Sequence, residues 1–338
     1  MKSGSLLHYI IIRLLLSIPM VLILLTLVFI LLRSAPGDPV TATVGMRLPP
    51  EEVAQRKEAL GLNDPILLQY VRYMGNSLTG HFGNPVTDRR SVGGILADTA
   101  PATIELAIAA MLVALIIGIT VGALAGRFRD TIFDTGGRLF GIIIYATPLF
   151  WTALLAQLYF SVKLNWLPSS GRVGGFNMPQ DITGFFTVDA IITGDWAALA
   201  STLAHLSLPA ITLGLMFGGV FARLVRVNML QTLRSDYVEA ARARGIRGRH
   251  VIFRHAFKNA LIPVITIMGL QFALMIGNAT LTETVFSWPG LARVLVEFIG
   301  KRDYAAVQGI VTFIAIVIVV VSLCIDIINA LIDPRVRY

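Results

Sequence analysis

Long stretches without a charged residue dominate the pattern of hydrophobic and polar positions along this chain of 338 residues. Six of these stretches contain 19 to 27 residues. A helix needs about 20 apolar residues to cross the hydrocarbon core of a bilayer. The pattern therefore predicts an all-α, polytopic membrane protein with six transmembrane helices. The predicted helices are Leu14–Leu32, Leu106–Gly126, Leu139–Val162, Trp196–Ala222, Asn259–Thr282 and Tyr304–Ile325.

The composition supports the same fold class. Hydrophobic residues make up 55% of the chain and charged residues only 14%, whereas soluble domains carry about a quarter charged residues. This balance excludes an ordinary soluble enzyme, a disordered chain and a fibrous protein. The fourth stretch is longer than a span requires, so we expect its transmembrane part to begin near Ser201. Pro209 and Pro263 are expected to kink or to start helices.

The distribution of lysine and arginine predicts the orientation of the chain in the membrane. If the N-terminus is inside, 16 of the 28 basic residues lie on the inner side, nine of them between Arg223 and Lys258. The inner segments then carry a net charge of +11, and the outer segments sum to about zero. Cytoplasmic loops are rich in basic residues, so both termini are expected in the cytoplasm. The net charge of +8 is thus explained by topology and does not indicate nucleic-acid binding.

The segments between the spans suggest a division of the chain. The outer segment 34–98 is expected to contain two short helices. The first begins at Pro50, with Glu51 and Glu52 in its first turn, and the second covers Ile66–Met74. The expected parts are an N-terminal transmembrane helix (1–33), this outer segment, a core of five membrane helices (99–332) that contains a long inner loop (226–262), and a cytoplasmic tail (333–338).

The inner loop contains a short helix with its own start and stop signals. Asp236 can cap its N-terminus, with Glu239 three residues later as in a capping box. Gly245 suits the left-handed residue that ends a helix, and Ala240 and Ala241 are expected to leave a smooth patch for a partner. A solvated loop helix would also explain the basic residues through the positive-inside rule. It would not explain a bounded two-turn helix inside a long loop.

Several motifs together resemble a known family. The pattern Glu239-Ala240-Ala241-x-x-x-Gly245 looks like the EAA loop of bacterial ATP-binding cassette (ABC) importer permeases. The whole set resembles the first permease subunit of the dipeptide and oligopeptide importers, a family that also takes up nickel chelates and glutathione. In the general EAA motif a Leu-Pro pair follows, whereas here Leu261-Ile262-Pro263 follows a longer spacer, which suits the peptide subfamily. The other matching motifs are Pro36-Gly37-Asp38-Pro39, Leu60-Gly61-Leu62, Leu281–Leu291, Arg302-Asp303-Tyr304, Gln308-Gly309 and Asp333–Arg337.

The resemblance implies a type I ABC importer permease fold and a set of partners. A homologous second permease would complete the translocation path through the bacterial inner membrane. Two cytoplasmic ATPase subunits would bind ATP and magnesium, and a periplasmic or lipid-anchored binding protein would deliver the peptide. This chain itself is expected to bind no cofactor or metal and to be no enzyme. It has no G-x-x-x-x-G-K-[ST] loop and no HExxH or GxSxG motif.

The resemblance also implies which residues couple transport to ATP hydrolysis. An ATPase groove would receive the loop helix, and Ala241→Arg is expected to uncouple hydrolysis from uptake. The implied coupling residues are Asp236, Tyr237, Glu239, Ala240, Ala241, Arg244 and Gly245.

Acidic residues near the span ends are the remaining candidates, since ionisable groups in a membrane are functional by default. Glu105 is expected to compensate a helix dipole, and Asp326 is expected to reach water. Glu283 could line the path, contact the binding protein or cap a local helix. Trp288 and Pro289 form a sharp turn that could anchor in the outer interface, contact the binding protein or act as a gate. No chain of acids or histidines crosses the membrane, which disfavours a proton-coupled carrier; an ATP-independent carrier or channel stays the alternative class.

Overall fold

The computed structural model describes residues 4–34, 49–59, 61–175 and 177–332. In these ranges the regular structure is entirely helical, which confirms the predicted fold class. The Pro36–Pro39 and Asp333–Arg337 motifs lie outside the described residues.

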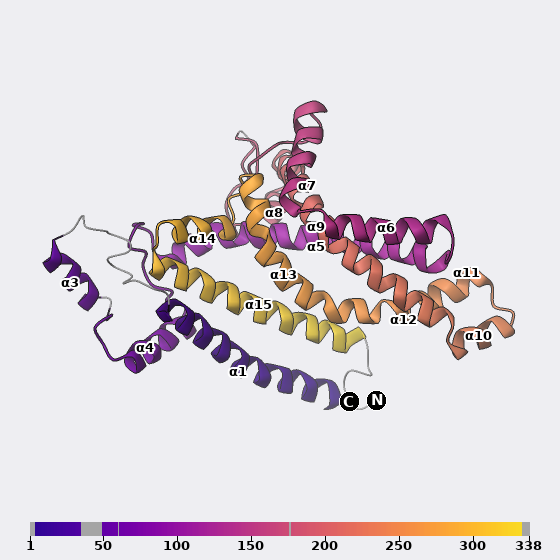
Figure 1. Cartoon of the computed structure of the whole chain (residues 1–338), viewed down its shortest axis with the longest axis horizontal. Helices are drawn as coiled ribbons and strands as arrows, with labels where there is room; N and C mark the ends of the chain where they lie inside the picture. The colour runs from indigo at the N-terminus through magenta and orange to yellow at the C-terminus, as the bar shows by residue number, and fades with distance from the viewer. Residues whose placement is uncertain (1–3, 35–48, 60, 176, 333–338) are drawn as a thin grey trace.

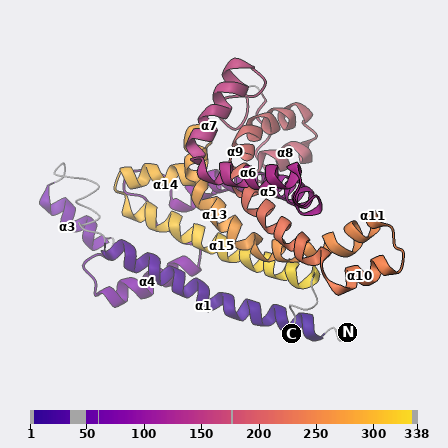
Figure 2. The ribbon, with the colours of Figure 1, turned by 45° about the vertical axis from the view of Figure 1, so that its right-hand side comes forward.

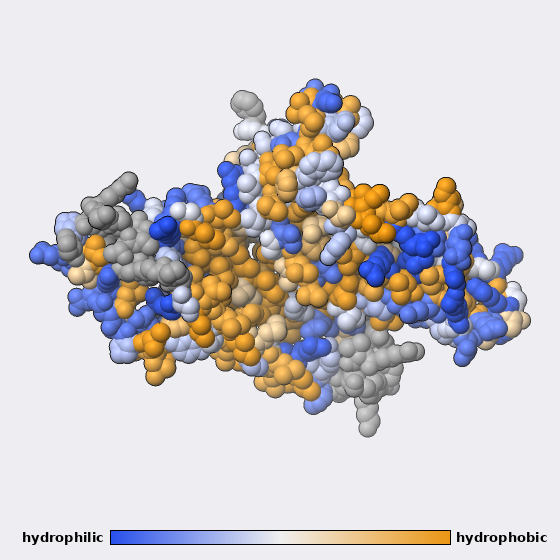
Figure 3. Space-filling view, in the orientation of Figure 1, coloured by the Kyte–Doolittle hydropathy of each residue, from blue (hydrophilic) through white to orange (hydrophobic). Residues whose placement is uncertain are grey.

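Among the residues that the structure describes, five helices are long and apolar enough to cross a membrane, and a bent pair of helices would make a sixth span. They are α1 (Gly4–Ser34), α5 (Val92–Arg127), α9 (Trp196–Leu233), α13 (Ile262–Val285) and α15 (Tyr304–Ile332). Figure 3 shows hydrophobic residues over the middle of the visible face and hydrophilic residues gathered towards its two ends. Large apolar side chains such as Ile116, Ile142 and Leu270 are exposed, which suits contact with lipid. Pro209 lies inside α9, and Pro263 lies in the first turn of α13.

The third predicted span is broken, which corrects the expectation of one straight helix over Leu139–Val162. Helix α6 (Ile132–Ala146) is followed by α7 (Leu149–Ala156) and the π-helix η2 (Gln157–Lys163), and the direction changes by 102°. Thr147 and Pro148 are extended at the break, with ψ of 126° and 134°. Proline disfavours the helical conformation of the residue before it, so α6 ends there. As a result α7 turns out of the direction of α6 and rises to one side of the molecule (Figures 1 and 2), where Ala153 packs against Leu208 of α9.

The shorter helices lie mainly at the two ends of the molecule. At one end, here called the loop end, are α10 (Asp236–Ala243) and α11 (Gly248–His250), and the start of α1 and the end of α15 point the same way (Figure 1). The π-helix η3 (Val251–Phe257) and α12 (Lys258–Ala260) join α11 to α13. The far end carries α3 (Pro50–Ala59), α4 (Ile66–Leu78) and α14 (Leu291–Gly300). Helix α8 (Phe186–Thr193) precedes α9.

The two predicted outer helices are present. Helix α3 carries Glu51 and Glu52 in its first turn, as expected. Helix α4 begins at Ile66, but it continues to Leu78, one turn beyond the predicted end at Met74.

Glycines allow α5 and α9 to pack closely at the centre of the fold. A Cβ atom on Gly122 would lie 2.5 Å from the Ala222 carbonyl oxygen and 2.7 Å from the Val225 Cβ. Gly118 and Gly126 face the same helix at similarly short range. Small residues at such positions let two membrane helices approach backbone to backbone.

Gly122→Ala is therefore expected to destabilise the protein by about 1–3 kcal/mol, the usual cost of overpacking a tight interface. The matched control is Gly277→Ala in α13, where an added Cβ would meet no atom within 4 Å. There alanine is expected to be neutral or stabilising, because it favours helix more than glycine does. Thermal unfolding of the detergent-solubilised variants measures the difference, and equal melting temperatures would contradict the packing argument.

Candidate functional site

Helix α10 begins one residue earlier than the capping pattern suggests. Ser235 is the N-cap residue, with extended backbone, and its hydroxyl donates to the Thr232 carbonyl oxygen at 2.5 Å instead of capping the helix. Asp236 is the first helical residue, so the predicted Asp236–Glu239 capping box is wrong. Both acids still lie in the first turn, where the helix dipole favours negative charge.

The predicted end of α10 is confirmed. Gly245 has φ of +72°, the left-handed conformation that glycine adopts without strain. Arg242 lies in the last turn and Arg244 is the C-cap residue. The Arg244 Nε donates to the Ala240 carbonyl oxygen at 3.3 Å, so a cation covers the negative end of the helix dipole.

One face of α10 is buried against the rest of the loop. Val238 and Ala241 are 0% and 1% exposed and pack with Val251 and Ala256 of η3. The side chain of Ala241 is therefore not available to a partner, and the expected smooth patch of Ala240 and Ala241 is reduced to Ala240. We call the four packed side chains, Val238, Ala241, Val251 and Ala256, the loop cluster.

The opposite face of α10 is open. Asp236, Glu239, Ala240 and Arg244 are exposed. Tyr237 is 44% exposed, and its hydroxyl accepts a hydrogen bond from Asn259 Nδ2 at 3.0 Å. These five residues of the predicted coupling set thus form one accessible surface, and α10 is held to the segment that leads into α13.

At the far end, Glu283 caps a neighbouring helix. It is fully buried near the end of α13; its Oε1 accepts from the Thr103 hydroxyl at 2.5 Å, and its Oε2 accepts from the Arg293 amide at 2.8 Å. The Thr103 oxygen in turn accepts from the Leu291 amide at 2.7 Å. These amides belong to the first turn of α14, whose free N–H groups need acceptors. Of the three roles predicted for Glu283, local helix capping is therefore the one that its contacts fit.

The turn after α13 also packs inward. Trp288 is fully buried, and its Nε1 donates to the Ala102 carbonyl oxygen of α5 at 2.9 Å. The prediction of an interfacial anchor is therefore wrong, because an anchor keeps its polar edge at the lipid headgroups. Pro289 is exposed. A Cβ atom at Gly290 would collide with the Glu283 carboxylate, so a larger residue there would push the carboxylate away from Thr103 and Arg293.

A buried ion pair that the sequence did not reveal joins α5 to the segment before α9. Arg172 donates through Nε and Nη2 to Glu105 Oε2, at 3.0 and 2.7 Å. The other carboxylate oxygen accepts from the Thr187 amide and hydroxyl at 2.8 and 2.6 Å. Arg172 also donates to the Gly184 carbonyl oxygen at 2.7 Å and lies 3.8 Å from the centre of the Phe186 ring. Glu105 lies well beyond the first turn of α5, so the expected helix-dipole role is wrong.

Asp189 of α8 organises the same segment. Its carboxylate is fully buried and accepts hydrogen bonds from the amides of Ile182, Thr183 and Gly184 and from the Thr183 hydroxyl. Burial alone would raise the pKa of Asp189, but these hydrogen bonds outweigh it and hold the pKa below its ordinary value. The carboxylate therefore stays ionised and fixes the loop that carries Gly184.

Two further ion pairs lie towards the loop end. Asp134 of α6 is fully buried and accepts from Arg226 of α9, with Nε–Oδ1 and Nη2–Oδ2 distances of 2.5 and 3.0 Å. Asp326 of α15 lies 3.1 Å from Arg13 of α1, and its side chain is 33% exposed. The expectation that Asp326 reaches water is thus consistent with its position, whereas the Asp134 pair was not predicted.

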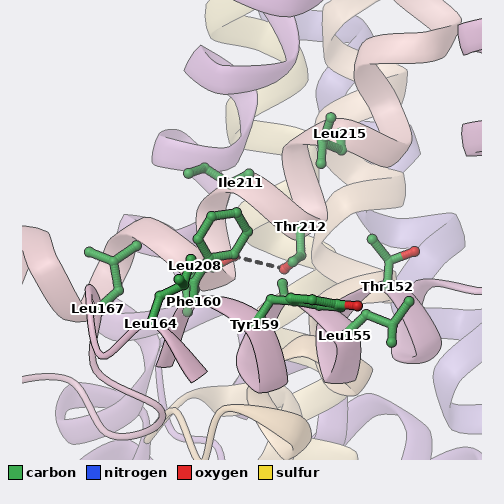
Figure 4. Close-up of a pocket in the computed structure, with 11 residues that line it drawn as sticks. Thr152, Leu155, Tyr159, Phe160, Leu164, Leu167, Leu208, Ile211, Thr212 and Leu215 are labelled. Carbon is green, nitrogen blue, oxygen red and sulfur yellow. Dashed lines mark hydrogen bonds between the residues drawn. The ribbon is translucent and has the colours of Figure 1, made fainter. Parts of the chain in front are cut away.

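A cavity of about 470 Å³ separates the projecting α7–η2 segment from α9 (Figure 4). Thr152, Tyr159 and Phe160 line one side, and Leu208, Ile211 and Thr212 line the other. No charged side chain lines it, so it offers no partner for the charged ends of a peptide. Among the residues that the structure describes, no three His, Cys, Asp or Glu side chains are grouped to hold a metal ion.

Comparison with known proteins identifies the family that this chain resembles along nearly its whole length. The model for the N-terminal part of binding-protein-dependent transport system membrane components matches residues 6–107, and the model for binding-protein-dependent transport system inner membrane components matches residues 118–338. The di/tripeptide transport system permease protein DppB of Pseudomonas aeruginosa is 40% identical over 313 residues, 92% of this chain and 93% of that protein. The dipeptide transport system permease protein DppB of Escherichia coli K12 is 38% identical over 336 residues, 98% of this chain and 99% of that protein. That of Alkalihalophilus pseudofirmus is 37% identical over 326 residues, 96% and 98% of the two chains.

Proposed function

This chain belongs to the family of binding-protein-dependent transport system inner membrane components, and we propose that it forms half of a translocation path for di- and oligopeptides. It is a permease subunit of an ABC importer in the inner membrane, and it is not itself the enzyme that drives transport. The observation that carries the peptide assignment is the match, over more than nine-tenths of both chains, to three permeases of di- or tripeptide transport systems.

In the proposed complex this chain has three kinds of protein partner. A homologous second permease completes the path, and two cytoplasmic ATPase subunits bind ATP and magnesium. A periplasmic or lipid-anchored binding protein delivers the peptide. The family name itself implies dependence on a binding protein. In this arrangement residues 99–332 are the permease core, and the loop 226–262 and both termini face the cytoplasm.

The open face of α10 is the proposed contact with the ATPase. Asp236, Tyr237, Glu239, Ala240 and Arg244 are accessible there. The buried Ala241 packs the helix against η3, and the left-handed Gly245 follows its C-cap. Closure of the ATPase dimer on ATP would displace α10. The loop cluster and the Tyr237–Asn259 hydrogen bond would pass this displacement to η3 and α13. Two-state motions of packed elements of this kind commonly carry conformational coupling.

At the far end, buried carboxylates support a proposed platform for the binding protein. Glu283 holds α14 against α5, and Glu105 holds the segment that contains Arg172. Glu283 and Trp288 are buried, so their proposed contribution to the path or to binding-protein contact is indirect. Pro289 is exposed beside them and could be touched directly. Nickel chelates, glutathione or another small solute are alternative substrates of the same machinery.

The test is reconstitution of the chain with its second permease, its ATPases and its binding protein in proteoliposomes. A dipeptide is expected to stimulate ATP hydrolysis and to accumulate inside only when all subunits and ATP are present. Stimulation by a nickel chelate or by glutathione, with none by di- or oligopeptides, would favour the alternative substrates. Uptake by this chain alone without ATP would contradict the importer assignment and favour a carrier or channel.

A further inference from the structure

An ion pair fastens α6 to α9 close to the start of the loop that carries α10. Asp134 lies in the first turn of α6 and is fully buried, and Arg226 lies on the last part of α9. Both carboxylate oxygens accept from the guanidinium group, in a bidentate arrangement. The Asp130 amide donates to Asp134 Oδ2 at 3.1 Å, and Arg138 Nε lies 3.7 Å from Oδ1. The carboxylate is thus fully engaged by groups from both helices.

Further along, α6 and α9 approach closely at a pair of glycines. The added Cβ of Gly219 on α9 would lie 3.5 Å from the Gly141 carbonyl oxygen and 3.6 Å from its Cα. Two glycine surfaces offer little interlocking between side chains. The Asp134–Arg226 pair is therefore the directional contact that sets how α6 follows α9, because a bidentate arginine–carboxylate pair fixes both distance and orientation.

The pair is also connected to α10. Helix α9 ends at Leu233, which packs against the loop cluster formed by Val238 and Ala241 with η3. Helix α6 leads through the break at Pro148 into the projecting α7–η2 segment. A displacement of α10 that moves the end of α9 would thus reach Arg226, then Asp134, and then α6.

We propose that the Asp134–Arg226 pair is a positioning device that transmits movement of α10 to α6 and to the α7–η2 segment. The inference rests on the proposed role of α10 as the ATPase contact. It adds a second route beside the one through η3 and α13, and it assigns a coupling role to two residues outside the EAA pattern.

The test uses the complete reconstituted complex and compares three forms of this pair. Asp134→Asn removes the charge from one partner and leaves Arg226 without its counter-ion. The double variant Asp134→Leu/Arg226→Met replaces both charges by apolar groups, which often preserves the stability of a buried pair. Uptake of dialanine per ATP hydrolysed is expected to fall by about tenfold in both variants. A merely structural role would lower the amount of assembled complex and leave this ratio unchanged.

A distance measurement gives an independent readout. Spin labels at the exposed positions Ile142 of α6 and Ile328 of α15 report the movement of α6, after the exposed Cys324 is replaced by serine. Trapping the complex with ATP and vanadate is expected to change this distance in the protein with the native pair. The change is expected to be lost in the double variant.

The outcomes separate the two claims. If the double variant takes up as much dialanine per ATP as the native pair and shows the same change in label distance, the transmission role is overturned. The proposed function would then stay intact. If the complex with the native pair neither takes up dialanine nor any other di- or oligopeptide with ATP, the proposed function fails, and the inference fails with it.

Discussion

Arg172→Leu is expected to destabilise the protein by about 3–5 kcal/mol, because it leaves a carboxylate buried without its cation. Glu105 and Arg172 are only 5% and 6% exposed, so water cannot replace the lost guanidinium. The two hydrogen bonds from Thr187 would remain, but they come from neutral groups. The substitution also removes the hydrogen bond to Gly184 and the contact with the Phe186 ring.

Two matched variants show whether the lost stability comes from the unpaired buried carboxylate or from the removal of an arginine as such. Arg72 pairs with Asp64 at 2.7 Å, but its side chain is 54% exposed, so Arg72→Leu is expected to cost about 0–1 kcal/mol. The double variant Glu105→Leu/Arg172→Leu removes both charges and is expected to recover most of the lost stability. Thermal unfolding in detergent measures all three. An Arg172→Leu variant as stable as Arg72→Leu would show that the carboxylate finds water or protonates at little cost.

The spans were predictable because backbone groups in lipid must bond within their own helix, which requires long apolar segments. The end of α10 was predictable for a similarly local reason, since Gly245 supplies the left-handed conformation. The break at Pro148 was missed because the apolar run continues across it. The signal was present in the sequence, since a proline restricts the residue before it, here Thr147.

The contacts of the acidic residues could not be predicted from local patterns. Glu105 and Arg172 are 67 residues apart in the sequence, and Glu283 and Thr103 are 180 apart. Pairing of this kind depends on how α5, α13 and the outer segments pack. The sequence could indicate that Glu283 needs a partner in an apolar environment, but helix capping, path lining and partner contact all satisfy that need. The sequence of α10 also did not show which of Ala240 and Ala241 is exposed. Ala241 is buried because it packs against η3, a separate helix whose position the pattern within α10 does not reveal.

Ala240→Arg is expected to reduce peptide uptake per ATP hydrolysed by about tenfold or more, the consequence of losing about 1.4 kcal/mol at a packed contact. Ala240 lies on the open face of α10, where an ATPase groove would need to approach the helix closely. An arginine there adds length and positive charge without touching the loop cluster. The permease is therefore expected to insert, to assemble with its second permease and to unfold at its normal temperature.

The same substitution at the next residue is expected to act differently, which makes the pair a sharp test. Ala241 is 1% exposed and packs against η3, so Ala241→Arg buries a cation in an apolar cluster and should unfold the loop. The Ala241→Arg variant is therefore expected to lose uptake because less complex assembles. The resemblance to the EAA loop had implied that this variant would only uncouple hydrolysis from uptake. Ala54→Arg on the exposed surface of α3 is the control for the added charge and is expected to behave like the unmodified protein. If Ala240→Arg couples normally while Ala241→Arg assembles but uncouples, the ATPase must contact the face of α10 that is buried in this chain, and the loop must open before it docks.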